Sequence, residues 1–169
     1  MDFQVGDAVV HPVYGLGQVI ELDEKQISGK VRRCYVVQAS CAEGSLSNNL
    51  TIWVPADGSG PYTLRQPTPP REFKRLFAIL SSPGEPLSTD RLERKMYLQG
   101  LMREGTLAAI CRVIRDLSLF GQTHRLNDQD AAILERAKDY LIKEWRLSLC
   151  TPRGEAEQEL ARLLAGRGR

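Results

Sequence analysis

The stretch FQVGDAVVHPVYGLGQV, Phe3–Val19, begins like a β-strand, meets a proline and resumes as a strand after two glycines. Pro12 has no N–H to donate to a β-ladder, so we expect the first strand to end there. Gly15 and Gly17 allow the backbone conformations that a sharp reversal needs, so the second strand can return beside the first. A phosphate-binding glycine loop would open a helix, whereas a strand pattern follows here. The stretch therefore predicts an antiparallel strand pair.

Strand-like runs continue to about residue 66 and are separated by the turn segments YGLG, SGK and EGSLSNN. The runs are DAVVHP (7–12), GQVIELDEKQI (17–27), VRRCYVVQAS (31–40) and LTIWVP (50–55). Four or five short strands with tight turns predict a small, strongly bent sheet of the Tudor or SH3 kind.

After RQPTPP the pattern becomes helical. Apolar residues recur at spacings of three and four in REFKRLFAIL (71–80), which we expect to form a connecting helix starting at Pro69 or Pro70. Further apolar stripes run through Leu107, Ile110, Cys111, Ile114 and Leu117, then Ile133, Leu134, Ala137, Leu141 and Trp145, and finally Leu160, Leu163 and Leu164. The chain is therefore predicted to be α+β, with a β domain at 1–68 and a compact all-helical domain at 69–169.

Several residues are expected to delimit these helices. Ser88 or Thr89 can cap a helix over residues 90–104, with Gly105 as its stop. Gly121 should close the next helix, and Asn127 or Asp128 should cap the one after it. For the last helix, the pattern predicts Thr151 as the N-cap and Pro152 at the first helical position.

The composition is that of a globular protein, with 42% apolar residues and a formal net charge of only +2. Any contact with nucleic acid must therefore come from a local basic patch. The four cysteines form no C-x-x-C pair, so we expect no metal site. Because neither a signal peptide nor a membrane-length apolar run is present, we expect a cytoplasmic protein with reduced thiols.

The titratable residues do not suggest an active site. His124 falls in a polar interhelical loop, His11 precedes a proline, and Cys111 lies on an apolar stripe. Asp128 and Asp130 fit the first turn of a helix, where carboxylates complement the helix dipole. We therefore expect an interaction protein with no enzymatic activity and no cofactor.

Several segments together resemble a known family. They are FQVGDAVVHPVYGLGQVIELDEKQISGKVRRCYVVQ, LTIWVP, VIRDL and RLNDQDAAILERAKDYLIKE, which follow in order over residues 3–149. The chain resembles CarD/CdnL-type bacterial transcription regulators. This resemblance implies that a Tudor-like domain docks on the RNA polymerase β subunit through a sheet edge. It also implies that the helical domain contacts promoter DNA at the upstream edge of the melted region and stabilises the open complex without sequence specificity.

Carried over by this resemblance, the polymerase-binding positions are Lys25, Ile27 and Trp53. Relatives commonly have a basic residue where this chain has Trp53. Strand alternation should turn Ile52 and Val54 toward the core and Trp53 outward, as an exposed interface anchor. The alternative is that Trp53 packs under the PTPP segment and fastens the two domains.

The DNA-binding positions carried over are Arg91, Arg94 and Lys95. Arg91 stands where the family has a tryptophan that wedges into the duplex, and the chain has no tryptophan between Trp53 and Trp145. Trp145 continues an apolar stripe and is expected in the core. Arginine can enter a narrow minor groove, so DNA contact stays possible, and the alternative is an ordinary solvated basic face.

Two hypotheses follow. The first is a monomeric regulator that binds the polymerase β subunit and makes sequence-tolerant contact with promoter DNA. The second is a divergent adaptor that docks on polymerase while its helical domain binds another protein instead of DNA.

Overall fold

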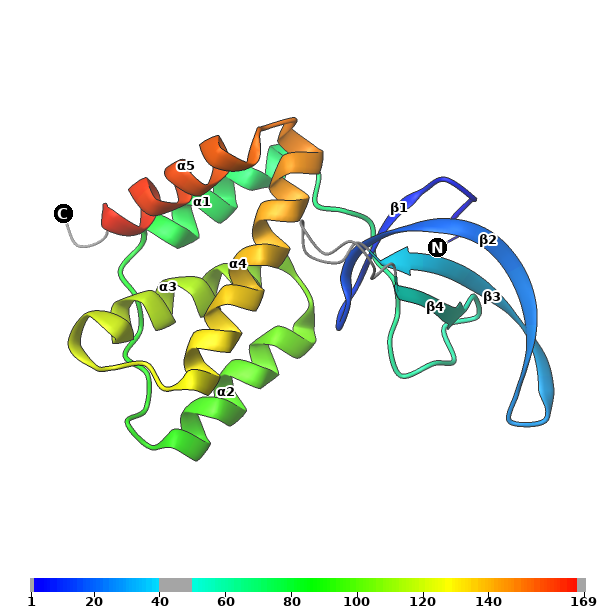
Figure 1. Cartoon of the computed structure of the whole chain (residues 1–169), viewed down its shortest axis with the longest axis horizontal. Helices are drawn as coiled ribbons and strands as arrows, with labels where there is room; N and C mark the ends of the chain where they lie inside the picture. Colours follow the sequence, from blue (N-terminus) through cyan, green and yellow to red (C-terminus); the bar gives the residue numbers. More distant parts are fainter. Residues whose placement is uncertain (1, 40–49, 167–169) are drawn as a thin grey trace. The chain divides into compact units, whose positions relative to one another are not determined.

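The computed structural model describes residues 2–39 and 50–166 and divides the chain into two units, Met1–Pro67 and Thr68–Arg169 (Figure 1). The first unit is a curled antiparallel sheet and the second is built of helices. The predicted α+β fold, a Tudor-like β domain followed by an all-helical domain, is confirmed.

Four strands form the described sheet: β1 (Ala8–His11), β2 (Gly15–Ile27), β3 (Lys30–Ala39) and β4 (Leu50–Pro55). They lie side by side in chain order, and each pair is antiparallel. Strand β1 ends at His11, directly before Pro12, as predicted. Three parts of the sequence discussed above lie outside the described residues. They are the predicted turn EGSLSNN, Ser40 at the end of the third strand-like run, and Cys41.

The two glycines of the opening stretch serve different purposes, which corrects the prediction for one of them. Gly15 has a φ of 76°, a left-handed conformation that suits glycine at a reversal. At Gly17, a β-carbon would lie 2.8 Å from the carbonyl oxygen of Gln38 and 2.9 Å from a methyl carbon of Val37. Gly17 is therefore needed because strand β3 passes close by, and not for the turn.

The core of the sheet is a single small cluster on its inner face. It consists of Phe3, Val9, Val19, Tyr35, Val37 and Val54. Ile52 and Val54 both contribute to this core, as strand alternation predicts. A register irregularity between Val19 and Glu21 interrupts the pairing of β2 with β3, and such bulges increase local bending.

Five α-helices make up the second unit. They are α1 (Phe73–Ser81), α2 (Arg91–Glu104), α3 (Leu107–Thr123), α4 (Asp128–Leu149) and α5 (Arg153–Ala165), with a 3₁₀ turn at Pro70–Glu72 before α1. The predicted apolar stripes all face one shared core, to which Ile133 and Leu164 contribute partly buried side chains. Trp145 is only 2% exposed, and its ring centroid lies 4.7 Å from that of Phe77. The expectation that Trp145 is a core residue is confirmed.

Three helix boundaries differ from the predictions. Asp90, not Ser88 or Thr89, caps α2, because its carboxylate is the group that accepts the backbone N–H of Glu93. Helix α3 continues through Gly121 to Thr123, since glycine weakens a helix without preventing it and Leu126 packs against this position. Helix α5 begins at Arg153, with Pro152 as its N-cap.

The remaining cap and stop residues match the sequence pattern. Asn127 caps α4 by accepting the backbone N–H of Asp130 at 2.8 Å. Gly105 ends α2 in a left-handed conformation with a φ of 69°. None of the helices in the described ranges is both long and apolar enough to cross a lipid bilayer.

Candidate functional site

Lys25 and Trp53, from two strands that are not paired with each other, meet on the outer face of the sheet. The ammonium nitrogen of Lys25 lies 4.0 Å from the centroid of the Trp53 ring, a cation–π contact. Trp53 is paired across the ladder with Val36, and its side chain is 41% exposed. The arrangement holds a flat apolar ring with an adjacent positive charge at the surface.

The third predicted position, Ile27, lies at the tip of the β2–β3 hairpin. It pairs with Lys30 and is half-buried, and residues Ser28 and Gly29 between them have φ angles of 54° and 79°. Because residues two apart in a strand share a face, Ile27 lies on the same face as Lys25. The structure thus brings Lys25 and Trp53 into contact and places Ile27 farther along the same surface.

The edge of the sheet next to this surface has no neighbouring strand among the described residues. Strand β4 pairs with β3 on one side, and within residues 2–39 and 50–166 no strand pairs with its other side. By contrast, β1 is bridged at Val10 by two backbone hydrogen bonds with Arg65. Among the described residues, this edge of β4 therefore leaves N–H and C=O groups without a ladder partner beside Trp53, the requirement for adding a partner strand.

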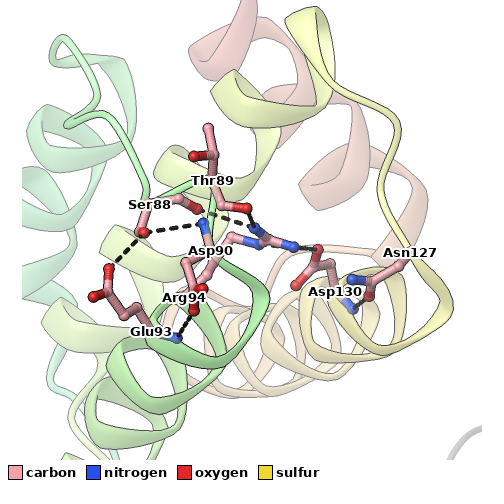
Figure 2. A network of polar contacts seen from close by, with 7 residues as sticks. All are labelled: Ser88, Thr89, Asp90, Glu93, Arg94, Asn127 and Asp130. Carbon is pink, nitrogen blue, oxygen red and sulfur yellow. Dashed lines mark hydrogen bonds and ion pairs between the residues drawn. The ribbon is translucent and has the colours of Figure 1, made fainter.

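The second predicted site is the N-terminus of α2, which a polar network organises (Figure 2). The Ser88 hydroxyl accepts a hydrogen bond from the backbone N–H of Asp90 and donates one to Glu93 at 2.8 Å. The Asp90 carboxylate in turn accepts the backbone N–H of Glu93 at 2.9 Å. The last of these bonds satisfies one of the free donors of the first turn, and together they give the helix a defined start.

The three basic residues predicted here have different environments. Arg91 is exposed and Lys95 is half-buried, whereas Arg94 is 5% exposed. The expectation that Arg94 belongs to a solvent-facing basic cluster therefore needs revision: its guanidinium points inward and all three of its nitrogens donate hydrogen bonds within the protein. Arg91 and Lys95, four residues apart on neighbouring turns, are the cations in the first half of α2 that keep solvent exposure.

Two exposed apolar residues on α2 were not among the predicted site residues. Leu92 and Met96 are each 65% exposed and lie four residues apart on the same side of the helix. They stand between and beside Arg91 and Lys95. The surface of α2 is consequently both basic and apolar, the composition of a contact surface more than of an ordinary solvated face.

The role of Asp130 was also missed, although a signal was present in the sequence. Asp130 fits a first-turn position of α4, and the structure shows that it also pairs with Arg94, whose Nη2 lies 2.9 Å from its Oδ2. Arg94 stands four residues before Leu98 and seven before Leu101, the two other buried residues of α2. That spacing puts Arg94 on the inward stripe of the helix, which implies a buried partner.

The remaining candidate chemical groups do not converge. Burial lowers the pKa of His11, whose Nδ1 accepts the backbone N–H groups of Val13 and Tyr14 at 3.0 and 3.2 Å. Burial, with Glu144 nearby, raises the pKa of Cys111 to about 12, so this thiol stays protonated and unreactive. In the ranges that the structure describes, no three His, Cys, Asp or Glu side chains are grouped to hold a metal ion.

A groove in the described helical unit lies between α4 and α5 and has a volume of about 380 Å³. Its charged lining residues pair with one another: Arg153 lies 3.0 Å from Glu157 and Lys138 lies 3.8 Å from Glu135. None of the predicted site residues lines it. The groove therefore adds no set of free catalytic groups to the chain.

Comparison with known proteins gives a consistent result for both units. Residues 3–60 match the CarD-like/TRCF RID domain, and residues 75–161 match the CarD C-terminal domain. The chain is also 26% identical over 146 residues to a Bacillus subtilis (strain 168) protein named "Putative transcription factor YdeB", covering 84% of this chain and 89% of that protein. The two matched domains occur in the order in which the structure places the sheet and the helices.

Proposed function

The chain belongs to the CarD-like family of transcription factors, and from this premise we propose that it docks on the RNA polymerase β subunit and contacts promoter DNA beside the transcription bubble. Family membership makes it a transcription regulator associated with RNA polymerase. The family is a class of transcription factors and not a known class of enzymes. The observation that carries the proposal is the ordered match of both units. We further propose that it acts as a cytoplasmic monomer.

For polymerase docking, we propose the surface formed by Lys25, Ile27, Trp53 and the open edge of β4, hereafter the strand-edge surface. A partner strand added to this edge would gain main-chain hydrogen bonds, and Trp53 would supply a large apolar contact beside it. The contact of Lys25 with the ring supports this assignment, because it holds the exposed tryptophan in one orientation before a partner arrives.

Binding of the protein to an isolated lobe of the polymerase β subunit tests the strand-edge surface. Trp53→Ala is expected to weaken binding by about 2 kcal/mol or more, because exposed aromatic anchors are typical interface hot spots. Val31→Ala is the matched control: Val31 is 70% exposed, and strand alternation puts it on the opposite face of the hairpin from Lys25. Failure of the unmodified protein to bind the lobe would refute polymerase docking by this surface.

For DNA contact, we propose Arg91 and Lys95 on α2, with the exposed side chain of Leu92 beside them. Arginine and lysine can neutralise phosphates near the minor groove, and exposed leucine is one of the side chains that press against base steps in minor-groove binders. Stabilising the open form of a promoter in this way requires no base-specific hydrogen bond.

The lifetime of the open complex on a promoter fragment tests the DNA contact. The protein should lengthen the lifetime, and Arg91→Ala combined with Lys95→Ala should shorten it again while leaving polymerase binding intact. Arg103→Ala removes one positive charge at the far end of the same helix and serves as the charge control for Arg91→Ala and Lys95→Ala made singly. An unchanged lifetime with polymerase-bound protein would contradict this part of the proposal.

The adaptor hypothesis has an observation of its own. Leu92 and Met96 are each 65% exposed and form an apolar pair on the surface of α2. Such a pair would suit a protein partner as well as DNA. The two functions differ in their response to salt. Affinity for forked promoter DNA that falls steeply with salt supports DNA contact, and its absence supports a protein partner.

A further inference from the structure

The guanidinium of Arg94 joins three parts of the helical unit. Its Nε and Nη2 donate to the Asp130 carboxylate of α4 at 3.1 and 2.9 Å. Its Nη1 donates to the backbone carbonyl oxygen of Ser88 at 3.0 Å, in the loop before α2 (Figure 2). The same group lies 4.7 Å from the centroid of the Phe120 ring of α3.

This ion pair is fully inside the protein. The side chains of Arg94 and Asp130 are 5% and 4% exposed. Asp130 is itself held in place, because its backbone N–H donates to the Asn127 side chain that caps α4. A buried pair of this kind depends strongly on both members, since removing one leaves the other charge without compensation.

Helix α2 has little else to hold its first half. In its first two turns, Arg91–Tyr97, Arg94 is the one fully buried side chain, and the next buried residue is Leu98. The exposed Arg91 and the half-buried Lys95 are carried on this same segment. The Arg94–Asp130 pair is therefore the main buried side-chain contact of the segment that carries these two cations.

We propose that Arg94 and Asp130 are positioning residues, which set the direction in which α2 presents Arg91 and Lys95 to DNA without contacting DNA themselves. The inference rests on the proposed DNA contact of α2. It divides the basic residues in the first half of the helix into two classes: Arg91 and Lys95 act on the partner, and Arg94 acts on the helix.

Asp130→Asn tests this inference by the sign of its effect. The substitution raises the net charge by one, so electrostatics alone would tighten binding to DNA. Loss of positioning should instead weaken binding to forked DNA and lower the slope of log affinity against log salt by about 1 to 2, because the contacts of Arg91 and Lys95 are lost. Asp128→Asn is the matched control, since Asp128 is exposed in the same first turn and makes the same change in charge. It should leave the slope unchanged and binding equal or slightly tighter.

A second measurement separates this inference from the proposed function. Hydrogen exchange of the free protein should show faster exchange of α2 amides in Asp130→Asn than in Asp128→Asn, while α3 stays protected. If Asp130→Asn does not fold, Arg94→Lys replaces it, because lysine keeps the charge and loses the planar fork. Unchanged exchange of α2, or DNA binding by a folded variant equal to that of its control, would overturn the inference. If the unmodified protein binds no DNA, the proposed function fails, and hydrogen exchange still decides whether the pair positions α2.

Discussion

His11 is a buried polar residue that holds the turn between β1 and β2. Its Nδ1 accepts two backbone N–H groups from the Pro12–Tyr14 turn, which requires this nitrogen to be unprotonated. Burial lowers the pKa of the imidazole below its usual value of 6.5. The unfolded chain therefore takes up a proton at a higher pH than the folded chain does.

The stability of the β unit should consequently depend on pH. The contribution of His11 is fully present above about pH 6.5, the unfolded value, and is lost as the pH falls through the lower folded pKa. Urea unfolding followed by Trp53 fluorescence, in a Trp145→Phe background, measures this. His11→Asn should remove this part of the pH dependence, because the amide oxygen can accept the same bonds and does not titrate. His124→Asn, at an exposed residue, should leave it unchanged.

Gly17 makes a second prediction at the residue scale. Gly17→Ala should destabilise the β unit by about 1–3 kcal/mol, because the new methyl group would meet the backbone of β3 at Gln38. Gly100→Ala is the contrasting variant: Gly100 lies in α2, and a β-carbon there meets no atom within 4 Å. It should stabilise the helical unit by about 0.5–1 kcal/mol. Equal effects in urea unfolding would show that the close approach at Gly17 is not limiting.

At the scale of the elements, the aromatic cluster between α1 and α4 holds the helical unit together. The Trp145 ring lies 4.7 Å from that of Phe77 and 6.3 Å from that of Phe73, measured between centroids. Trp145→Ala should lower the free energy of unfolding by about 3–5 kcal/mol, the usual cost of deleting a buried aromatic side chain. Leu147→Ala, at an exposed residue of the same helix, should change it by less than about 0.5 kcal/mol. Thermal unfolding of the two variants compares them directly.

Helix α2 differs from its neighbours at this scale. Its buried residues are Arg94, Leu98 and Leu101, so a polar pair holds its first half and apolar contacts hold its second half. Because the buried pair holds the first half of the helix against α3 and α4, Leu92 and Met96 can be exposed without detaching the helix. The same construction makes the direction of its surface depend on a single ion pair.

At the scale of the whole molecule, the two units have separate cores. The hydrophobic cluster of the sheet and that of the helices share no residue. Thr68 belongs to the helical unit, since its hydroxyl donates to Glu144 at 3.2 Å and its carbonyl oxygen accepts the hydroxyl of Ser148 at 2.5 Å. Each unit therefore carries its own stabilising contacts.

We expect the two proposed functions to be separable between fragments. Residues 1–67 should retain binding to the polymerase lobe, and residues 68–169 should fold cooperatively and bind forked DNA more weakly than the whole chain bound to polymerase does. Circular dichroism and binding assays on both fragments measure this. A helical fragment starting at residue 72 should be less stable than one starting at 68, because it lacks the bonds of Thr68 to α4.

Local sequence patterns account for the features that depend on neighbouring residues. Pro12 ends β1, the apolar stripes form the helical core, and Trp145 lies inside it, because strand alternation, helical periodicity and the lack of a proline N–H act within a few positions of the chain. The choice of Asp90 as a cap was less determined, since Ser88, Thr89 and Asp90 are all competent and only the geometry of the turn selects one.

Which distant residues meet depends on how the elements pack, and local patterns do not show it. Arg94 and Asp130 are 36 positions apart, and Lys25 reaches Trp53 across an intervening strand. Local patterns place each of these residues on a face of its own element, but the partner on that face is set by how the elements pack. For this reason the sequence does not distinguish Arg91, Arg94 and Lys95. Burial does: Arg94 holds the helix, and the helix presents Arg91 and Lys95 to a partner.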